Sequence, residues 1–288
     1  MWIIYALLTA FFLATSDMLT KRVLATGDEY FVAWARLVFA LPLLAASLFF
    51  IEVPPLNRTF WTATLCAIPL EITAIILYTR ALKISPISLT MPFLALTPLF
   101  LIVISYFIAG ERISFSGGVG IVLMALGSYM LSFHKIRHSL AEPFKAIFRD
   151  KGCVLMIIVA FIYSMTSSLG KVAISNSSAV FFGSFYFMLI ALLFTPITLI
   201  MNKGKIRMTR KDIIPLSAIG ITQSLMIIFH MTAMSMTKVA YMISVKRTSL
   251  LFSIIYGYFI FREEKIAEKT VGALMMLTGF LMIVLGGK

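Results

Sequence analysis

Long apolar stretches separated by short polar connectors dominate the pattern of this chain. A helix needs about 20 mostly apolar residues to cross the roughly 30 Å hydrocarbon core of a bilayer. Ten stretches approach that length, and their connectors are too short to form a folded domain outside a membrane. We therefore predict an all-α integral membrane protein with ten transmembrane helices. The predicted spans are 2–20, 30–51, 60–82, 86–109, 115–133, 152–174, 180–201, 213–236, 239–261 and 270–285.

An internal repeat divides the chain into two similar halves. At an offset of about 150 residues, four residues of the first half recur in the second: Tyr106, Glu111, Gly120 and Gly127 match Tyr258, Glu263, Gly272 and Gly279. Lys21 likewise matches Lys171. Because each half has an odd number of spans, the second copy enters the membrane from the opposite side, which predicts two inverted five-helix repeats. We place the first repeat at 1–138, an amphipathic linker at 139–151 and the second repeat at 152–288.

Composition supports a membrane protein and argues against several other classes. The chain is 60% hydrophobic and only 13% charged, whereas about a quarter of an average soluble domain is charged. The net charge is +13, but the basic residues lie in connectors and not on one face, so we expect the lipid bilayer and no nucleic acid as a partner. Cys66 and Cys153 cannot form a disulfide framework. The first apolar run begins without a basic leader, so we expect a retained helix.

The chain also resembles a known family. The residues that carry the resemblance are Tyr78 to Leu82, Ser85, Pro86, Pro92, Pro98 and Gly110 to Arg112 in the first half, and Ala233, Met234, Val239, Ala240 and Arg262 to Glu264 in the second. These runs resemble the two repeats of the EamA family in the drug/metabolite transporter superfamily. The resemblance implies a multi-pass protein of the cell (inner) membrane. Its relatives are mostly exporters of amino acids, metabolites or drugs, with lipid-linked sugar flippases more distant.

Two signals give opposite orientations. Cytoplasmic loops of membrane proteins collect Lys and Arg. Most of the 25 basic residues lie after the first, third, fifth, seventh and ninth spans, which predicts that both termini lie outside the cytoplasm. The resemblance implies the opposite, because ten-helix relatives usually keep both termini in the cytoplasm. Both orientations are open at this point.

Two adjacent cations are the principal candidates for a solute site. A charge at the centre of a membrane helix costs roughly 3 kcal/mol and needs a partner or a wet cavity. Lys246 and Arg247 lie about two turns inside the ninth predicted span. The ammonium group of a lysine is a point charge, and the planar guanidinium group of an arginine can donate two parallel hydrogen bonds to a carboxylate or phosphate. We therefore predict an anion-attracting pocket. The alternatives are an ion pair with a carboxylate such as Glu71, and snorkelling to the membrane surface.

Other polar residues within the predicted spans are further candidates. Glu71 is the deepest carboxylate, and Gln223 is its counterpart in the second repeat. Glu71 could exchange a proton with the solvent, whereas pairing with Arg36 or Arg80 would make it structural. Two aromatic residues are candidate ligands, with packing as the alternative role: Tyr78 and Trp34.

Asp17 and Lys21 are four residues apart near the end of the first span, the spacing of an ion pair on a helix surface. A structural pair and a coupling site are both open interpretations. In the related small multidrug proteins the proton-coupling carboxylate lies two turns before the matching lysine. Leu13 occupies that position here, which argues against proton-coupled drug antiport.

The fourth predicted span contains three prolines, Pro86, Pro92 and Pro98. Each interior proline removes a backbone hydrogen bond, so we expect a helix break around Pro92 and Pro98. The repeat aligns this region with Lys246, so one half would bend where the other carries charge. Transporter sites favour interrupted helices at the interface of two repeats.

These features favour a transporter, which we expect to export small organic metabolites of the amino-acid or organic-anion type by alternating access. The alternatives are a flippase of a lipid-linked sugar or phosphate, and a non-transporting sensor or scaffold. No residues have the spacing of a catalytic set or a metal cluster, so we expect no enzyme, no metal and no cofactor. The sequence leaves open the solute, the direction of transport, the coupling to protons and the choice between monomer and homodimer.

Overall fold

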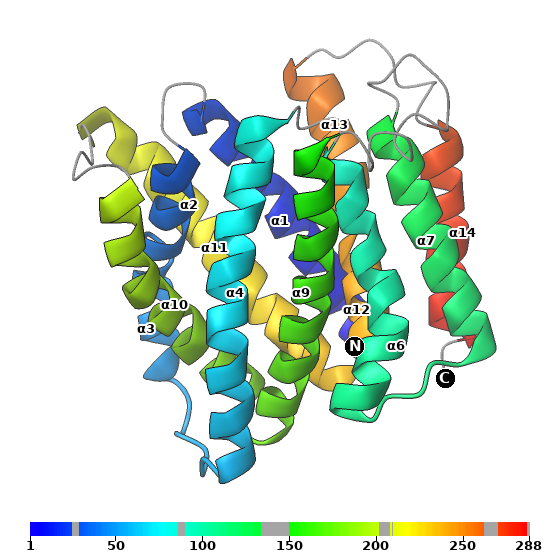
Figure 1. Ribbon diagram of the computed structural model, residues 1–288, viewed down its shortest axis with the longest axis horizontal. Helices are drawn as coiled ribbons and strands as arrows, with labels where there is room; N and C mark the ends of the chain where they lie inside the picture. Colours follow the sequence, from blue (N-terminus) through cyan, green and yellow to red (C-terminus); the bar gives the residue numbers. More distant parts are fainter. Residues whose placement is uncertain are drawn as a thin grey trace.

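The apolar stretches of the sequence fold into helices (Figure 1). The computed structural model describes residues 1–24, 29–85, 90–133, 150–201, 208, 210–261 and 270–286, and these ranges contain no strand. The helices are α1 (Trp2–Leu24), α2 (Glu29–Val38), α3 (Leu41–Leu48), α4 (Arg58–Ile84), the 3₁₀ helix η1 (Met91–Leu96), α6 (Thr97–Ala109), α7 (Phe115–Phe133), α9 (Lys151–Ser175), α10 (Ala179–Met201), α11 (Arg210–Met236), α12 (Val239–Lys246), α13 (Ser249–Phe261) and α14 (Thr270–Gly286).

Eight helical segments among the described residues are long and apolar enough to cross a membrane. They are Trp2–Thr20, Tyr30–Leu48, Arg58–Ile84, Met91–Ala109, Lys151–Ser175, Ala179–Met201, Asp212–Met236 and Val239–Tyr256. Two further apolar helices, Phe115–Leu131 and Thr270–Gly286, are shorter. The predicted all-α, multi-pass class is confirmed. Pro86 and nearly all of the predicted linker lie outside the described residues.

Three of the membrane-crossing segments are interrupted. Phe39 and Ala40 separate α2 from α3, and η1 gives way to α6 at Thr97. The segment 239–261 breaks between α12 and α13, and α13 begins at Ser249, which is 152 residues after Thr97. The two repeats are therefore interrupted at matching positions. Proline explains only the first of these matching breaks, and our expectation that one half bends while the other only carries charge is corrected accordingly.

Helix pairs recur between the two halves. In the internal repeat, α1 corresponds to α9 and α4 corresponds to α11. Because α1 packs along α11 and α4 packs along α9, each pair is the repeat equivalent of the other. In Figure 1, α1 rises away from the N-terminus whereas α9 descends, and both chain termini lie toward the lower side. The main packing in the bundle is therefore between the halves and not within each.

The remaining close pair, α7 and α14, lies at one edge of the bundle (Figure 1). Glycines allow the two backbones to approach. A methyl group added at Gly120 would lie 2.7 Å from the carbonyl oxygen of Gly279, and one added at Gly127 would lie 2.7 Å from that of Gly272. Since Gly120 matches Gly272 in the repeat and Gly127 matches Gly279, the contact is symmetric about its own centre. Small residues are the usual means by which membrane helices pack closely.

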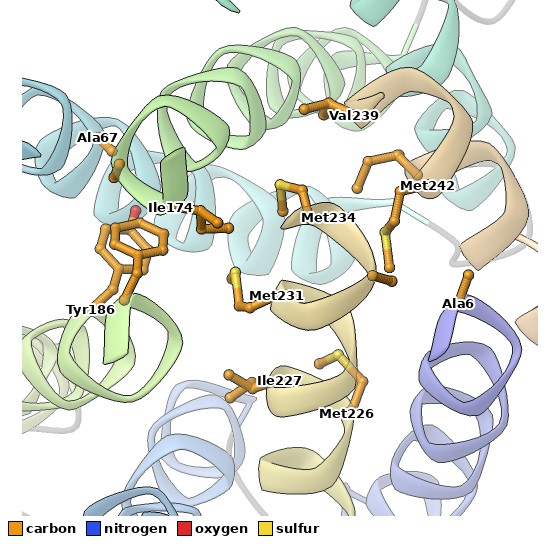
Figure 2. Close-up of a cluster of buried hydrophobic side chains, with 14 of the residues drawn as sticks. Ala6, Ala67, Ile174, Tyr186, Met226, Ile227, Met231, Met234, Val239 and Met242 are labelled. Carbon is orange, nitrogen blue, oxygen red and sulfur yellow. The ribbon is translucent and has the colours of Figure 1, made fainter. Parts of the chain in front are cut away.

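Methionine side chains fill much of the core between the halves. Figure 2 shows Met226, Met231 and Met234 on α11 and Met242 on α12, in a cluster that also contains Tyr186 of α10. Each is at most 5% exposed. A thioether on three rotatable bonds adapts to irregular space. The core beside the interrupted segment α12–α13 is therefore built from side chains that can repack.

Candidate functional site

The two interrupted segments meet through Arg247. In a regular α-helix the carbonyl of Leu94 would accept the N–H of residue 98, but Pro98 has none. The Leu94 carbonyl instead accepts the N–H of Thr97 and, at 2.6 Å, the Nη2 of Arg247, which also lies 3.3 Å from the Thr97 hydroxyl. A cation from the second half thus satisfies a carbonyl that proline frees in the first half. Pro92 lies within η1, immediately before this junction.

Lys246, the other predicted cation, has no such partner. Its side chain makes no hydrogen bond and no ion pair within the described part of the chain. It lies within electrostatic range of Glu71 and Asp17, and also of two cations, Arg36 and Arg247. An ammonium group needs hydrogen-bond acceptors to offset its lost hydration. Water or a ligand that carries hydrogen-bond acceptors would therefore be stabilised beside the ammonium group of Lys246.

Glu71 lies near Lys246 but is not in contact with it. The Thr166 hydroxyl on α9, which donates to the Tyr163 carbonyl at 3.4 Å, is a polar neighbour of Glu71, and Glu71 interacts electrostatically with Lys246. The structure shows no ion pair between Glu71 and either Arg36 or Arg80. Of the partners considered from sequence, Lys246 is thus the cation that Glu71 faces.

Asp17, Arg36 and Gln223 form a second polar group. The Nη1 of Arg36 lies 2.8 Å from the Asp17 carboxylate, and its Nε donates to the Gln223 amide oxygen at 2.6 Å. Three helices, α1, α2 and α11, are joined in this way. Asp17 thus pairs with Arg36, while the side chain of Lys21 lies outside the described part of the structure.

The two aromatic candidates differ in their surroundings. Tyr78 lies within electrostatic range of Asp17, Arg36 and Arg247, and its hydroxyl is 3.5 Å from the sulfur of Met91. Trp34 donates its indole N–H to the Thr195 hydroxyl on α10 at 2.9 Å. The structure therefore brings Tyr78 to the polar cluster and gives the polar atom of Trp34 a structural partner.

Four residues at this cluster were not among the predicted site residues. Tyr163 interacts electrostatically with Glu71, Tyr78, Arg36 and Arg247, and Tyr186 interacts with Glu71 and Tyr163. The others are Thr166, a polar neighbour of Glu71, and His230, which lies near Lys246. For Tyr163 and Thr166 a signal existed, since they belong to the polar run 163–168 inside an apolar helix. Tyr186 and His230 stand alone in apolar sequence, and only packing brings them to the cluster.

Several polar atoms of the cluster are buried without a hydrogen-bond partner in the described structure. They are the hydroxyl of Tyr186, the Nδ1 of His230 and the Nε of Arg247. Tyr186 and His230 are only 4% and 7% exposed. Buried polar groups are normally paired, and each orphan calls for an explanation such as a bound ion, water or ligand. These orphans come from α10, α11 and the α12–α13 break, and all three residues interact with Glu71, Lys246 or Tyr78.

The part of the cluster that contains Asp17 is partly exposed. Asp17, in the C-terminal part of α1, is half-exposed. Val239 and Tyr241, in the first turn of α12, are buried. Glu111 accepts the N–H of Val239 at 2.8 Å, and Lys171 donates to the carbonyls of Met234 and Thr237.

A shallow apolar hollow on the α7–α14 pair, lined by Ser116, Thr278, Leu281, Met282, Leu285 and Gly286, is separate from this cluster. It contains no charged group. Within the described ranges, no three His, Cys, Asp or Glu side chains gather as a metal site requires. The chemistry of the site is thus that of cations, carboxylates and hydroxyl groups.

Fold and site together define a multi-pass helical membrane protein with a polar cluster between two similar halves. The sequence matches the model of the EamA-like transporter family over residues 1–133 and 150–285, so the chain belongs to that family. No curated protein matches the sequence significantly. Among solved structures 27 chains match. One of them, a crystal structure titled only as that of a protein, is 14% identical, covers 99% of this chain and 96% of its own, and superposes with a TM-score of 0.78.

Proposed function

We propose that this protein is a carrier that exports small organic anions across the cell (inner) membrane by alternating access. The observation that carries the proposal is the ammonium group of Lys246, which has no hydrogen-bond partner and lies beside Arg247, whose Nε is also unpartnered. A carboxylate or phosphate would supply acceptors to both groups and offset their charge. No chemical change of the solute is part of this proposal, and the protein acts as a carrier and not as an enzyme.

Alternating access also needs an architecture that can open on either side. The proposed arrangement is ten spans in two inverted repeats, with the site where the repeats meet. It is supported by the reciprocal pairs α1–α11 and α4–α9 and by the matching breaks at Thr97 and Ser249. Rocking of one half against the other would move the α6 and α13 ends around Arg247. The α7–α14 pair would remain a peripheral scaffold.

The proposed direction is export, with the solute loaded from the cytoplasm. The proposal is supported by the half-exposed Asp17 in the C-terminal part of α1, since most Lys and Arg residues follow α1 and the other odd-numbered spans in the sequence. The positive-inside rule assigns the side where α1 ends to the cytoplasm. A site loaded from the cytoplasm belongs to an exporter, and both termini would then lie outside the cytoplasm.

Thermal stability of the purified protein tests the anion site, because a ligand stabilises the folded state by mass action. The protein is heated with anionic, neutral and cationic metabolites in turn, as wild type, Lys246→Gln and Lys83→Gln. Lys83 is the matched control, since it is an exposed lysine in the last turn of α4. We expect stabilisation by particular anions in the wild type and Lys83→Gln only. Equal stabilisation of all three proteins by anions, or by neutral compounds alone, would contradict the proposal.

A further inference from the structure

Three polar residues of the cluster, Glu71, Tyr163 and Tyr186, are not used by the proposed contacts of the anion with Lys246 and Arg247. The Glu71 carboxylate interacts electrostatically with Lys246 and with the side chains of Tyr163 and Tyr186. Figure 2 shows Tyr186 reaching from α10 toward Ala67 of α4, one helical turn before Glu71. The Tyr186 ring is held by stacking on Phe182, with centroids 5.0 Å apart. Its position is therefore fixed by packing, although its hydroxyl has no partner.

Glu71 and Tyr186 can form further hydrogen bonds. A carboxylate offers about four lone-pair positions, and Thr166 is the only hydroxyl group of the described structure that contributes to the hydrogen bonding of the Glu71 carboxylate. The hydroxyl of Tyr186 can both donate and accept. A solute group placed between Glu71 and Tyr186 would need to donate at least one hydrogen bond. Hydroxyl and ammonium groups both meet this condition.

Charge distinguishes between these two groups. Asp17 and Arg36 neutralise each other as an ion pair. The remaining charged residues of the described cluster are Lys246, Arg247 and Glu71, whose charges sum to +1 when Glu71 is ionised. A solute with one negative charge neutralises this sum, whereas a zwitterion leaves it unchanged and a dianion reverses it. Since uncompensated charge inside a membrane protein is costly, the balance favours a monoanion whose donors are uncharged.

We propose that Glu71 and Tyr186 form a second subsite that binds hydroxyl groups of the solute. This inference rests on the proposed anion carrier. The solute class is a singly charged, hydroxylated organic acid. Its anionic group lies against Lys246 and Arg247, and its hydroxyl groups donate to Glu71 and pair with the Tyr186 hydroxyl. A binding site that hydrogen-bonds a substrate hydroxyl discriminates strongly against the analogue that lacks it, because the buried polar groups of the site are then left unpaired.

Four compounds with the same four-carbon skeleton separate charge from hydroxyl content: butanoate, threonate, 2-aminobutanoate and succinate. Their binding is measured by thermal shift or calorimetry with the purified full-length wild type. We expect threonate to bind at least about tenfold more tightly than butanoate. 2-Aminobutanoate and succinate should both bind more weakly than threonate, because their net charges do not match the site. Equal binding of threonate and butanoate, or tightest binding of either of the other two, would overturn the inference.

Two conservative variants assign the preference to residues. Tyr186→Phe keeps the stacked ring and removes only the hydroxyl, and Glu71→Gln keeps the side-chain shape and removes the charge. Both should reduce the preference for threonate over butanoate, measured as the ratio of the two affinities in each variant. A preference that persists in both variants would overturn the inference.

The test also separates this inference from the proposed function. If butanoate binds in a Lys246-dependent manner but threonate binds no better, the anion carrier stands and the hydroxyl subsite is wrong. If none of the four compounds binds in a Lys246-dependent manner, both are wrong.

Discussion

At the scale of single residues, the cations of the cluster fall into two kinds. Arg36 is satisfied by Asp17 and Gln223 and joins three helices. Lys246 has no hydrogen bond among the described residues. A buried charge that is paired stabilises the fold only modestly, but leaving its partner unpaired is costly. Lys246 is partly buried, and an unpaired, partly buried cation lowers stability unless a ligand is present; such residues are retained where function requires them.

Replacing each cation by methionine should therefore change stability in opposite directions. Without ligand, Lys246→Met should raise the midpoint of thermal unfolding of the purified protein, because a poorly solvated charge is removed. Arg36→Met should lower the midpoint, with a loss of roughly 1–2 kcal/mol in the free energy of unfolding, because Asp17 and Gln223 lose their partner. The loss is limited because Asp17 is half-exposed. A lower midpoint for Lys246→Met would mean that Lys246 has a structural role.

At the scale of helices, the start of α9 shows how one carboxylate fixes an end. Asp150 caps the helix, accepting the N–H of Cys153 at 3.0 Å and the hydroxyl of Ser85, from the end of α4, at 2.6 Å. Partial burial acts to raise the pKa of Asp150, but the hydrogen bonds from Ser85 and from the N–H groups of Cys153 and Gly152 outweigh it. They lower the pKa below the ordinary value of 3.8.

This lowered pKa predicts a pH-dependent stabilisation. The ionised cap contributes stability above the unfolded-state pKa of about 3.8, and the contribution is lost as the pH falls through the lower folded-state pKa. Asp150→Asn mimics the protonated form at every pH. At pH of about 6 it should be less stable than the wild type, by up to about 1 kcal/mol. The difference between the two proteins should shrink as the pH falls below about 3.8 and through the lower folded-state pKa. A difference in thermal midpoint that stays constant as the pH is lowered would contradict the assignment.

The α7–α14 contact makes a second prediction at this scale. Gly120→Ala places a methyl group 2.7 Å from the Gly279 carbonyl, so the helices must separate. Gly118→Ala on the same helix meets nothing nearer than 4.0 Å and serves as the control. We expect Gly120→Ala to lower unfolding stability by about 1–3 kcal/mol and Gly118→Ala to leave it nearly unchanged or slightly raised. Similar thermal midpoints for the two variants would show that the close approach does not occur.

At the scale of the whole molecule, the sequence predicted the helices and the pairing of the halves better than it predicted the site. Apolar length sets the spans, and recurring residues such as Gly120 and Gly272 reveal the repeat. Pro98 predicted the break at Thr97, but no local signal marks the matching break before Ser249. That break depends on tertiary contacts of Arg247, which sequence periodicity does not contain.

The site shows the same division. Charges inside apolar runs identified Lys246, Arg247 and Glu71, because such residues are costly wherever they lie. Sequence could not assign their partners, since Asp17 meets Arg36 and Glu71 meets Thr166 only after four helices have packed. Tyr186 and His230 differ from ordinary core residues only in having buried polar atoms without partners, and that property exists only in the folded structure.

Counterflow in proteoliposomes tests most directly whether the chain carries organic anions through the Lys246 site. Vesicles preloaded with unlabelled threonate are diluted into radiolabelled threonate, using wild type, Lys246→Gln and Lys83→Gln. The account predicts transient accumulation of label with the wild type and Lys83→Gln, and none above protein-free vesicles with Lys246→Gln. Accumulation with Lys246→Gln at the wild-type rate would contradict it, because the solute would then cross without the cation on which the proposed site depends.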